Sequence, residues 1–168
     1  MKKAFLGIGS NKGNRKKNIA KALSLLSQNK KINLVKVSKL LKNPPQEGVK
    51  GGFFLNGVVL LKTSLSPIQL FWLCKKIEKK LGRKPIHDKW FTIHDSRTID
   101  LDILFYEKKI IKSKRLTIPH PRLHKRYFVL KPLMEIGRDF VHPILRKKVE
   151  KLYTSLRGGS ERADAAIS

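Results

Sequence analysis

The positions of hydrophobic and polar residues predict that strands and helices alternate along the first half of the chain. A buried strand over residues 4–9 ends in glycines, and residues 14–27 follow with apolar residues at helical spacing. Residues 32–40 alternate in the manner of a second strand, which the breaker Asn43-Pro44-Pro45 closes. A third strand is predicted over residues 53–61. Each strand is short enough to belong to one sheet of ordinary size.

The remaining elements complete one domain. They are a helix over 66–82, a polar loop over 83–97, a strand over 98–105, a short hairpin arm over 110–118, a loop and helix over 119–136, and a short helix over 146–156. Asn14 and Ser66 are placed to cap the two long helices, and Pro67 suits a first helical position. The composition changes at Gly158, so we expect a single domain over residues 1–157 and a disordered tail over 158–168.

The order of these elements indicates a fold class. The first six predicted elements follow the order strand, helix, strand, strand, helix, strand. This is the order of a ferredoxin-like α+β domain. We therefore predict a mainly antiparallel sheet with helices on its faces, in a three-layer α/β/α arrangement, with extra elements at the end.

Composition limits the class of protein. The apolar runs are far shorter than the ~18 residues that cross a bilayer, and no signal-type apolar stretch follows Met1-Lys2-Lys3. The one cysteine, Cys74, excludes a disulfide framework or a structural zinc cluster and fits a reducing compartment. We expect a soluble, cytoplasmic protein with no membrane partner.

The charge of the chain points to an anionic partner. Its 168 residues include 38 Lys and Arg against 12 Asp and Glu, which gives a formal net charge of +26. That partner could be a nucleic acid, a membrane surface or a phosphorylated small molecule. The basic residues are spread along the chain, as on a solvated surface, and there is neither an aromatic RNA-binding strand motif nor a Gly-x-x-Gly clamp in a helical context. A basic nucleic-acid-binding module remains the alternative hypothesis, and it rests on the charge alone.

Two aspartates on one predicted strand are the first candidate for chemistry. Side chains alternate between the faces of a strand, so Asp100 and Asp102 share one face while Ile99, Leu101 and Ile103 bury the other. Their Cα atoms then lie ~6.6 Å apart, and carboxylates that close repel each other unless a cation lies between them. Three of the six aspartates of this basic chain occur within residues 95–102. The pattern favours a Mg²⁺ site shared with substrate phosphates over a solvent-facing strand.

Two further segments could bind an anion. Residues 7–13, Gly-Ile-Gly-Ser-Asn-Lys-Gly, form a glycine-rich turn between a strand and a helix, but they match neither the dinucleotide fingerprint nor the phosphate loop of ATPases. In the second segment, Arg115, His120, Arg122 and Arg126 place several donors close together, as a polyphosphate requires. His120 and His124 alone would be an ordinary surface pair, and the zinc-protease pattern fails.

Taken together, these motifs resemble those of the 6-hydroxymethyl-7,8-dihydropterin pyrophosphokinases of folate biosynthesis. The resemblance covers roughly residues 3–145 and is carried by Gly9-Ser10-Asn11, Asn43-Pro44-Pro45, Phe54-Leu55-Asn56, Arg97-Thr98-Ile99-Asp100-Leu101-Asp102-Ile103, and Ile118-Pro119-His120-Pro121-Arg122 followed by Arg126 and Phe128. It implies transfer of the β,γ-diphosphoryl unit of ATP to the hydroxymethyl group of the pterin, with release of AMP.

The resemblance also implies roles for particular residues. Two Mg²⁺ ions would bridge Asp100 and Asp102 to the triphosphate, while Arg83 and Arg97 clamp the transferring phosphates. The positions that match the ATP-binding residues of the family are Glu78, Arg97, Ile103, Arg115, Thr117, His120 and Arg126. Those that match its pterin-binding residues are Gly9, Asn43, Pro44, Gln46, Phe54, Asn56 and Phe128, with the ring stacked between the two phenylalanines.

The sequence departs from many relatives in one loop. The segment from Trp90 to Arg97 is longer than their link to the aspartate strand, and Lys84-Pro85 stands where some relatives have a second loop arginine. A lysine supplies a point charge but not the bidentate fork of an arginine. We expect an active, monomeric enzyme with no obligate nucleic acid partner. A phosphate-binding relative that has lost activity is the lesser alternative.

Overall fold

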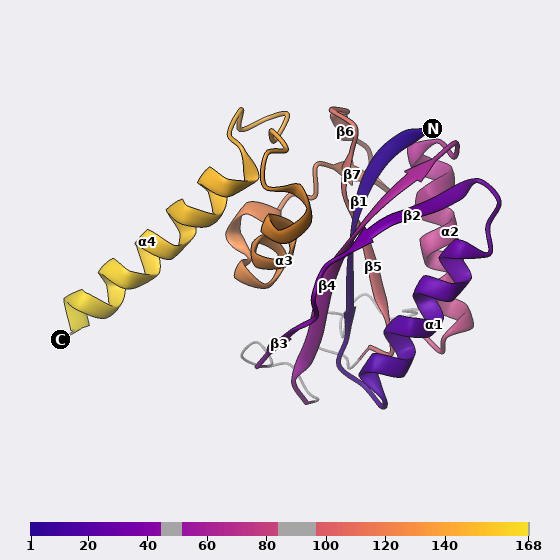
Figure 1. The fold of residues 1–168 in the computed structure, drawn as a ribbon, viewed down its shortest axis with the longest axis horizontal. Coiled ribbons are helices and arrows are strands. Elements are labelled where there is room, and N and C mark those ends of the chain that lie inside the picture. Colours follow the sequence, from indigo (N-terminus) through magenta and orange to yellow (C-terminus); the bar gives the residue numbers. More distant parts are fainter. Residues whose placement is uncertain (45–51, 84–96, 168) are drawn as a thin grey trace.

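An antiparallel sheet forms the centre of the molecule (Figure 1). The computed structural model describes residues 1–44, 52–83 and 97–167, and the side chains up to residue 158. The sheet consists of β1 (Lys2–Ser10), β2 (Ile32–Val37), β3 (Leu41–Asn43), β4 (Phe54–Thr63) and β5 (Asp100–Tyr106). The strand order is β2-β4-β1-β5, with β3 also paired to β4, and every pairing is antiparallel. The predicted α+β class with an antiparallel sheet is confirmed.

Helices lie on both sides of this sheet (Figure 1). On one side are α1 (Arg15–Ser27) and α2 (Pro67–Lys80), and on the other is α3 (Tyr127–Gly137), which α4 (Val149–Ile167) packs against. The predicted caps are present, because the Asn14 side chain accepts a hydrogen bond from the backbone N–H of Lys17 and Ser66 forms a capping box with Gln69. These caps satisfy backbone donors that a helix start leaves unpaired.

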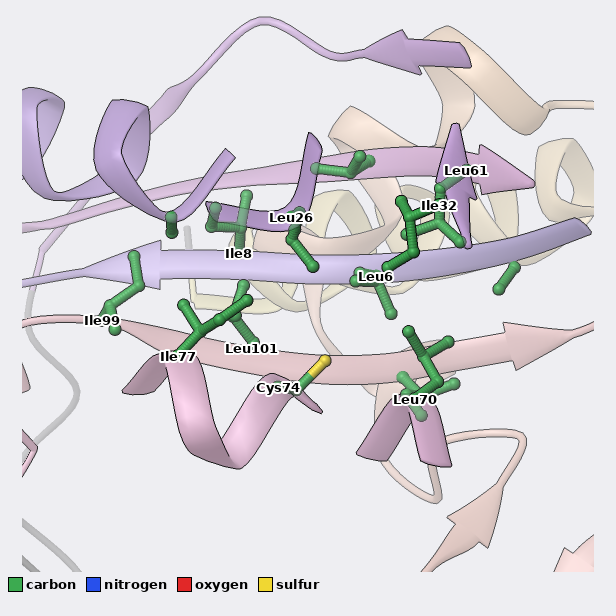
Figure 2. Close-up of a cluster of buried hydrophobic side chains, with 14 of the residues drawn as sticks. Leu6, Ile8, Leu26, Ile32, Leu61, Leu70, Cys74, Ile77, Ile99 and Leu101 are labelled. Carbon is green, nitrogen blue, oxygen red and sulfur yellow. The ribbon is translucent and has the colours of Figure 1, made fainter. Parts of the chain in front are cut away.

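The two sides of the sheet have separate hydrophobic cores. The first core includes Leu6, Leu26, Cys74 and Leu101 from β1, α1, α2 and β5, as Figure 2 shows. The second core packs β1, β4 and β5 against α3 and α4, with Phe105 and Leu133 fully buried. A single sheet therefore has one apolar face against each helical layer, and a polar site on either face must lie beyond the end of a core.

The smaller elements complete the fold. They are the hairpin arm of β6 (Ile111–Lys112) and β7 (Thr117–Ile118), which pair antiparallel, and the short 3₁₀ helix η1 (Leu123–Lys125). The backbone N–H of His120 donates to the carbonyl of Leu104 at 3.0 Å, which fastens the segment after β7 to β5. No helix among the described residues is long and apolar enough to cross a membrane.

Several element boundaries differ from the sequence prediction. The strand expected over 32–40 stops at Val37, because the Ser38 hydroxyl accepts the N–H of Val58 at 2.9 Å and interrupts the backbone ladder. Strand β5 begins at Asp100 rather than residue 98. The helix expected over 146–156 runs from Val149 to Ile167, and it includes most of the segment for which a disordered tail was expected.

Candidate active site

The two aspartates of β5 project from the same face of the sheet. Leu101 and Ile103 are 1% and 5% exposed within the first core, whereas Asp100 and Asp102 are half-buried on the opposite face. The predicted alternation is confirmed for these residues. A β-bulge then interrupts the strand where it passes β1, so Leu104 and Phe105 both pack into the second core. The acidic face therefore ends where this core begins.

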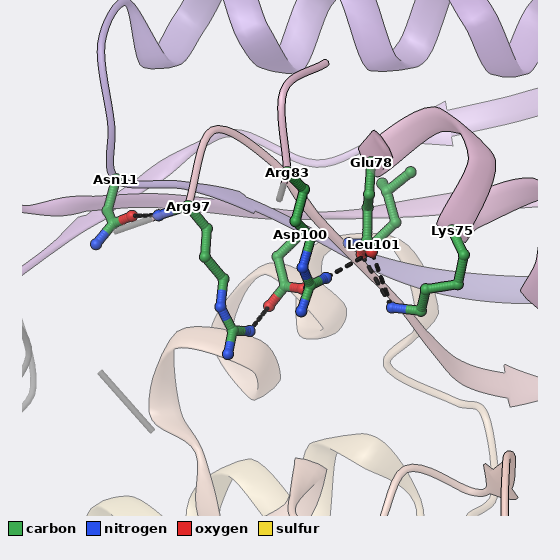
Figure 3. Close-up of polar contacts among 7 residues, drawn as sticks. All are labelled: Asn11, Lys75, Glu78, Arg83, Arg97, Asp100 and Leu101. Atoms are coloured by element: carbon green, nitrogen blue, oxygen red, sulfur yellow. Dashed lines mark hydrogen bonds and ion pairs between the residues drawn. The ribbon is translucent and has the colours of Figure 1, made fainter. Parts of the chain in front are cut away.

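Asp100 is paired with two arginines (Figure 3). The Arg83 Nη1 atom lies 2.9 Å from Asp100 Oδ1, and the Arg97 Nη1 atom lies 2.9 Å from Oδ2. Burial alone would raise the pKa of Asp100, but the positive charges of Arg97 and Arg83 outweigh it and lower the pKa below its ordinary value. Asp100 is therefore a fully ionised carboxylate at neutral pH.

Asp102 has a different environment although it is only two residues away. It forms no salt bridge with a residue that the structure describes. Burial and the negative charge of Asp100 raise the pKa of Asp102 to about 6, and the positive charge of Lys75 opposes them only in part. Asp102 is a carboxylate that forms no ion pair with a described residue although cations lie near it, and such a carboxylate is suited to bind a metal ion.

Glu78 ties helix α2 to this site. Its carboxylate is buried, with a side chain 1% exposed, and it accepts the backbone N–H of Leu101 at 2.8 Å between the two aspartates. It also receives Lys75 Nζ and Arg83 Nη1, so Arg83 bridges Glu78 and Asp100 (Figure 3). Lys75 was not predicted as a site residue, although its position three residues before Glu78 on a helix was a sequence signal for the pair.

Glycines of β1 separate the aspartates from a polar residue of β4. Gly9 pairs with Asn56 on one side and with Asp100 on the other, so these three residues form a row across β4, β1 and β5. Two strand spacings put the Asn56 and Asp100 Cα atoms ~10 Å apart on one face. A Cβ atom on Gly9 would lie 2.5 Å from Asn56 Oδ1, so only glycine leaves room for the Asn56 amide there. The result is an open floor between an amide and a carboxylate.

The other residues predicted to bind pterin lie near the same end of β4. Asn43 of β3 pairs with Phe54 of β4, and Pro44 follows directly, whereas Gln46 lies outside the described residues. The Asn43 Nδ2 atom is buried and has no hydrogen-bond partner among the described residues. Such a donor is costly unless a ligand supplies an acceptor. Phe54 is half-buried and lies two residues before Asn56 on β4.

The segment after β7 brings a further cation toward Asp102. Arg126 precedes α3, and its positive charge acts on the Asp102 carboxylate, while its Cζ atom lies 5.6 Å from the ring centroid of Phe128. Burial and the charge of Arg126 lower the pKa of His120 to about 4. The His120 Nδ1 atom accepts the backbone N–H of Arg122 at 3.2 Å, so His120 is neutral at pH 7 and carries its proton on Nε2.

Several of the predicted ATP-binding residues form no bond with the aspartates in the described structure. Among the described residues, no hydrogen bond or ion pair links Arg115 or Thr117 to Asp100 or Asp102. Arg115 instead lies 5.6 Å from the ring centroid of the exposed Trp72 on α2. The Ile103 side chain is buried in the first core, so an ATP contact at this position would use its backbone.

The fold and this site define a class of enzyme. The site combines two carboxylates and several arginines with a glycine floor on an antiparallel sheet of an α+β fold. Such a site is suited to transfer a phosphoryl unit from a nucleotide to a second substrate.

A family model described as 7,8-dihydro-6-hydroxymethylpterin-pyrophosphokinase matches residues 5–138. The 2-amino-4-hydroxy-6-hydroxymethyldihydropteridine pyrophosphokinase of Aquifex aeolicus is 40% identical over 90% of this chain and 90% of its own length. The enzyme of the same name from Bacillus subtilis is 39% identical over 79% of this chain and 77% of its own. The chain belongs to the 7,8-dihydro-6-hydroxymethylpterin-pyrophosphokinase family. Its activity is pyrophosphoryl transfer from ATP to hydroxymethyldihydropterin in folate biosynthesis, so the activity predicted from the sequence is confirmed.

Other relatives are larger proteins. The folic acid synthesis protein fol1 of Pneumocystis carinii is 45% identical over 83% of this chain, which corresponds to 18% of that protein. A solved HPPK-DHPS structure in complex with substrates superposes over 96% of this chain and 44% of that chain, with a TM-score of 0.70 at 14% identity. The Plasmodium falciparum HPPK-DHPS with pteroate gives a TM-score of 0.71 over 92% of this chain and 42% of that chain. This chain thus spans less than half of these proteins, and the likeness to the solved structures confirms the fold alone.

Proposed function

We propose that the pyrophosphoryl transfer takes place on the face of β1 and β5 that carries Asp100 and Asp102. The observation that carries this proposal is the row Asn56, Gly9, Asp100 across three strands. It offers a pterin-reading amide on one side of a glycine floor and a phosphate-handling carboxylate on the other. On this proposal the pterin lies against Gly9, between Phe54 and Phe128, with Asn43, Pro44, Gln46 and Asn56 at its polar edge.

The carboxylates fit Mg²⁺ as the metal of this reaction. Mg²⁺ prefers oxygen ligands and often takes one or two carboxylates together with substrate phosphates. Asp102 is a partly buried carboxylate with a pKa raised to about 6 by burial and by the charge of Asp100, so it gains from a neighbouring cation. No described group of three or more His, Cys, Asp or Glu side chains could hold a metal ion. We therefore propose that Asp100 and Asp102 hold two Mg²⁺ ions only together with the oxygens of ATP.

The arginines give the ligand-free site a way to respond to its substrates. Arg83 and Arg97 occupy the two Asp100 oxygens that a cation would take, so these ion pairs and cation binding at Asp100 are alternatives. An arginine released from Asp100 is free to donate to a phosphate oxygen, for which its fork is suited. Glu78 holds Arg83 through a second contact and keeps it close to the site when Asp100 changes partner.

The reaction exchanges one phosphorus–oxygen bond for another. The hydroxymethyl oxygen of the pterin loses its proton to solvent and bonds to the β-phosphorus. The bond from that phosphorus to the oxygen shared with the α-phosphate breaks, so AMP leaves with that oxygen. Bound Mg²⁺ neutralises charge on the triphosphate. Arg83 and Arg97 donate to the transferring phosphates and stabilise the charge that develops on them. Arg115, Thr117, His120, Arg126 and the backbone of Ile103 hold the remainder of ATP, and neutral His120 offers a donor at Nε2.

The wider description of the protein is also part of this proposal. The order β2-β4-β1-β5 and the two helical layers support a ferredoxin-like, three-layer α/β/α fold. We propose a monomeric, cytoplasmic enzyme in which residues 1–157 form the catalytic domain. A nucleic-acid-binding module is favoured only by the net charge of +26 and predicts affinity that ignores pterin and falls steeply with salt.

Pterin-dependent AMP release from ATP tests the proposal. Purified protein with Mg²⁺ should form AMP only when the pterin is present, and Asp100→Ala or Asp102→Ala should lower kcat by at least about 10²-fold, as for other groups that stabilise a charged transition state. Asp139→Ala is the matched control, because Asp139 is an exposed aspartate that pairs with Lys148 and is not a predicted site residue. Full activity of both β5 variants would refute the site.

A further inference from the structure

Asn11 holds the backbone of the arginine that reaches Asp100. It follows β1 directly and is 1% exposed. Its backbone N–H donates to the Arg97 carbonyl at 3.1 Å, and its Oδ1 atom accepts the Arg97 N–H at 2.5 Å. Asn11 thus bonds both the N–H and the C=O of Arg97. A residue on a paired strand would do the same with its backbone, whereas here the Asn11 side chain supplies the acceptor. The amide orientation follows from this contact, because only the oxygen can accept an N–H.

The position of Arg97 makes this contact important. Arg97 lies three residues before Asp100, and its Nη1 atom is 2.9 Å from Asp100 Oδ2. Figure 3 shows Asn11 against the Arg97 backbone while the guanidinium extends to Asp100. Two hydrogen bonds hold the Arg97 backbone, and they limit the positions that its guanidinium can reach. The guanidinium is then restricted to Asp100 or to an anion close to it.

The two polar atoms of the Asn11 side chain differ in their partners. Its Nδ2 atom is buried and has no hydrogen-bond partner among the described residues, whereas its Oδ1 atom accepts the Arg97 N–H. The hydrogen bond that the described structure gives this amide is therefore directed to Arg97. Asn18 closes the same turn with its Nδ2 atom bonded to the Lys12 carbonyl at 2.8 Å.

We propose that Asn11 is a positioning residue that acts through Arg97. By fixing the Arg97 backbone it places the guanidinium where it can leave Asp100 for the transferring phosphates. This inference rests on the proposed function, since it needs Arg97 to act in phosphoryl transfer. The effect belongs to the chemical step, so it should appear in kcat and leave the KM for pterin nearly unchanged. A misplacement of about 1 Å of such a group can cost about 10²-fold in rate.

A double-mutant cycle between Asn11 and Arg97 tests the proposal. Asn11→Ala should lower kcat by about 10- to 100-fold in the wild-type background, because the guanidinium loses its anchor. In the Arg97→Ala background the same change should cost less than about threefold, since no guanidinium remains to position. Equal losses in both backgrounds would overturn the proposal, and so would wild-type kcat for Asn11→Ala.

Two further variants separate positioning from folding. Asn11→Asp keeps an oxygen that can accept the Arg97 N–H and removes the unpaired donor, so it should recover most of the lost kcat. Asn18→Ala is the matched control from the same turn. It removes the bond to the Lys12 carbonyl but no contact with Arg97, so it should keep kcat within about threefold of wild type. Failure of Asn11→Asp to recover kcat would contradict the proposal. If the wild-type enzyme itself forms no pterin-dependent AMP, the proposed function fails. If it forms AMP but Asn11→Ala costs the same in both backgrounds, only the proposed role of Asn11 fails.

Discussion

Asp100 and Asp102 lie on one face of one strand, yet their surroundings give them opposite electrostatic properties. Two arginines bind Asp100, and their charges keep its pKa below the ordinary value despite burial. Asp102 has no such partner in the described chain, and burial and the charge of Asp100 raise its pKa to about 6. One carboxylate is neutralised by the protein, and the other requires a cation that the described residues do not supply.

This difference separates stability from function within a single site. Asp100 contributes to the folded state through its ion pairs, whereas Asp102 costs folding free energy whenever it is ionised. A carboxylate whose pKa is raised by burial and by a second carboxylate is typical of a functional site. The comparison also explains why the two aspartates need not contribute equally to any property of the ligand-free protein, although both are proposed to hold Mg²⁺.

The largest stability effect expected from this comparison is a difference in sign between two matched variants. Asp100→Asn should destabilise the ligand-free protein at pH 7, because it leaves Arg83 and Arg97 without their carboxylate. Asp102→Asn should stabilise it, because it removes a buried charge that lacks a partner. Each change should be about 1–3 kcal/mol, which corresponds to several degrees in Tm. Thermal unfolding of both variants would measure it, and shifts of the same sign would contradict the comparison.

The pH dependence of stability should follow from Asp102. Its folded-state pKa, raised by burial and by the charge of Asp100, is about 6 against an ordinary value of 3.8, so the folded protein binds this proton more tightly than the unfolded chain. The contribution of Asp102 to stability is therefore full below about pH 4 and is lost as the pH rises to about 6. Denaturant unfolding at pH 4 and pH 7 should show that Asp102→Asn stabilises the protein at pH 7 and has little effect at pH 4. A gain that is equal at both pH values would assign the effect to something other than charge.

The smallest expected effect is a rise in the pKa of Asp100 when one of its two arginines is removed. Arg83→Gln removes one of its two cations and leaves Arg97 in place. The pKa of Asp100 should rise toward that of an ordinary carboxyl, because burial is then opposed by fewer charges. Carboxyl titration by NMR would follow the change, with Lys148→Gln as the control, since Lys148 pairs with the exposed Asp139. An unchanged pKa would mean that Arg97 alone determines the ionisation of Asp100.

Sequence reasoning reached much of the fold because its signals are local. Alternation placed Asp100 and Asp102 on one face, and the caps at Asn14 and Ser66 marked both helix starts. The strand pairings are different, because the row of Asn56, Gly9 and Asp100 joins segments that are far apart in the chain. No local pattern determines that register.

The partners of the site residues were also beyond sequence reasoning. Glu78 was assigned to ATP by resemblance, but in the structure its carboxylate is fully engaged by Lys75, Arg83 and the backbone of Leu101. Asn11 belonged to a recognised motif without a role, because its contact with Arg97 spans 86 residues of sequence. Such contacts depend on tertiary packing, so the sequence could indicate the residues of the site more readily than what each one holds.

The Mg²⁺ dependence of ATP binding tests the central claim most directly. A non-hydrolysable ATP analogue should bind the wild-type protein at least about tenfold more tightly with Mg²⁺ than without it, a difference of about 1.4 kcal/mol that calorimetry resolves. In Asp102→Asn the gain in affinity from Mg²⁺ should be clearly smaller, because one of the two proposed carboxylate ligands is lost, while the protein remains folded with a raised Tm. If Mg²⁺ tightens binding equally in Asp102→Asn and in wild type, Asp102 is not a metal ligand and the account of the two aspartates is wrong.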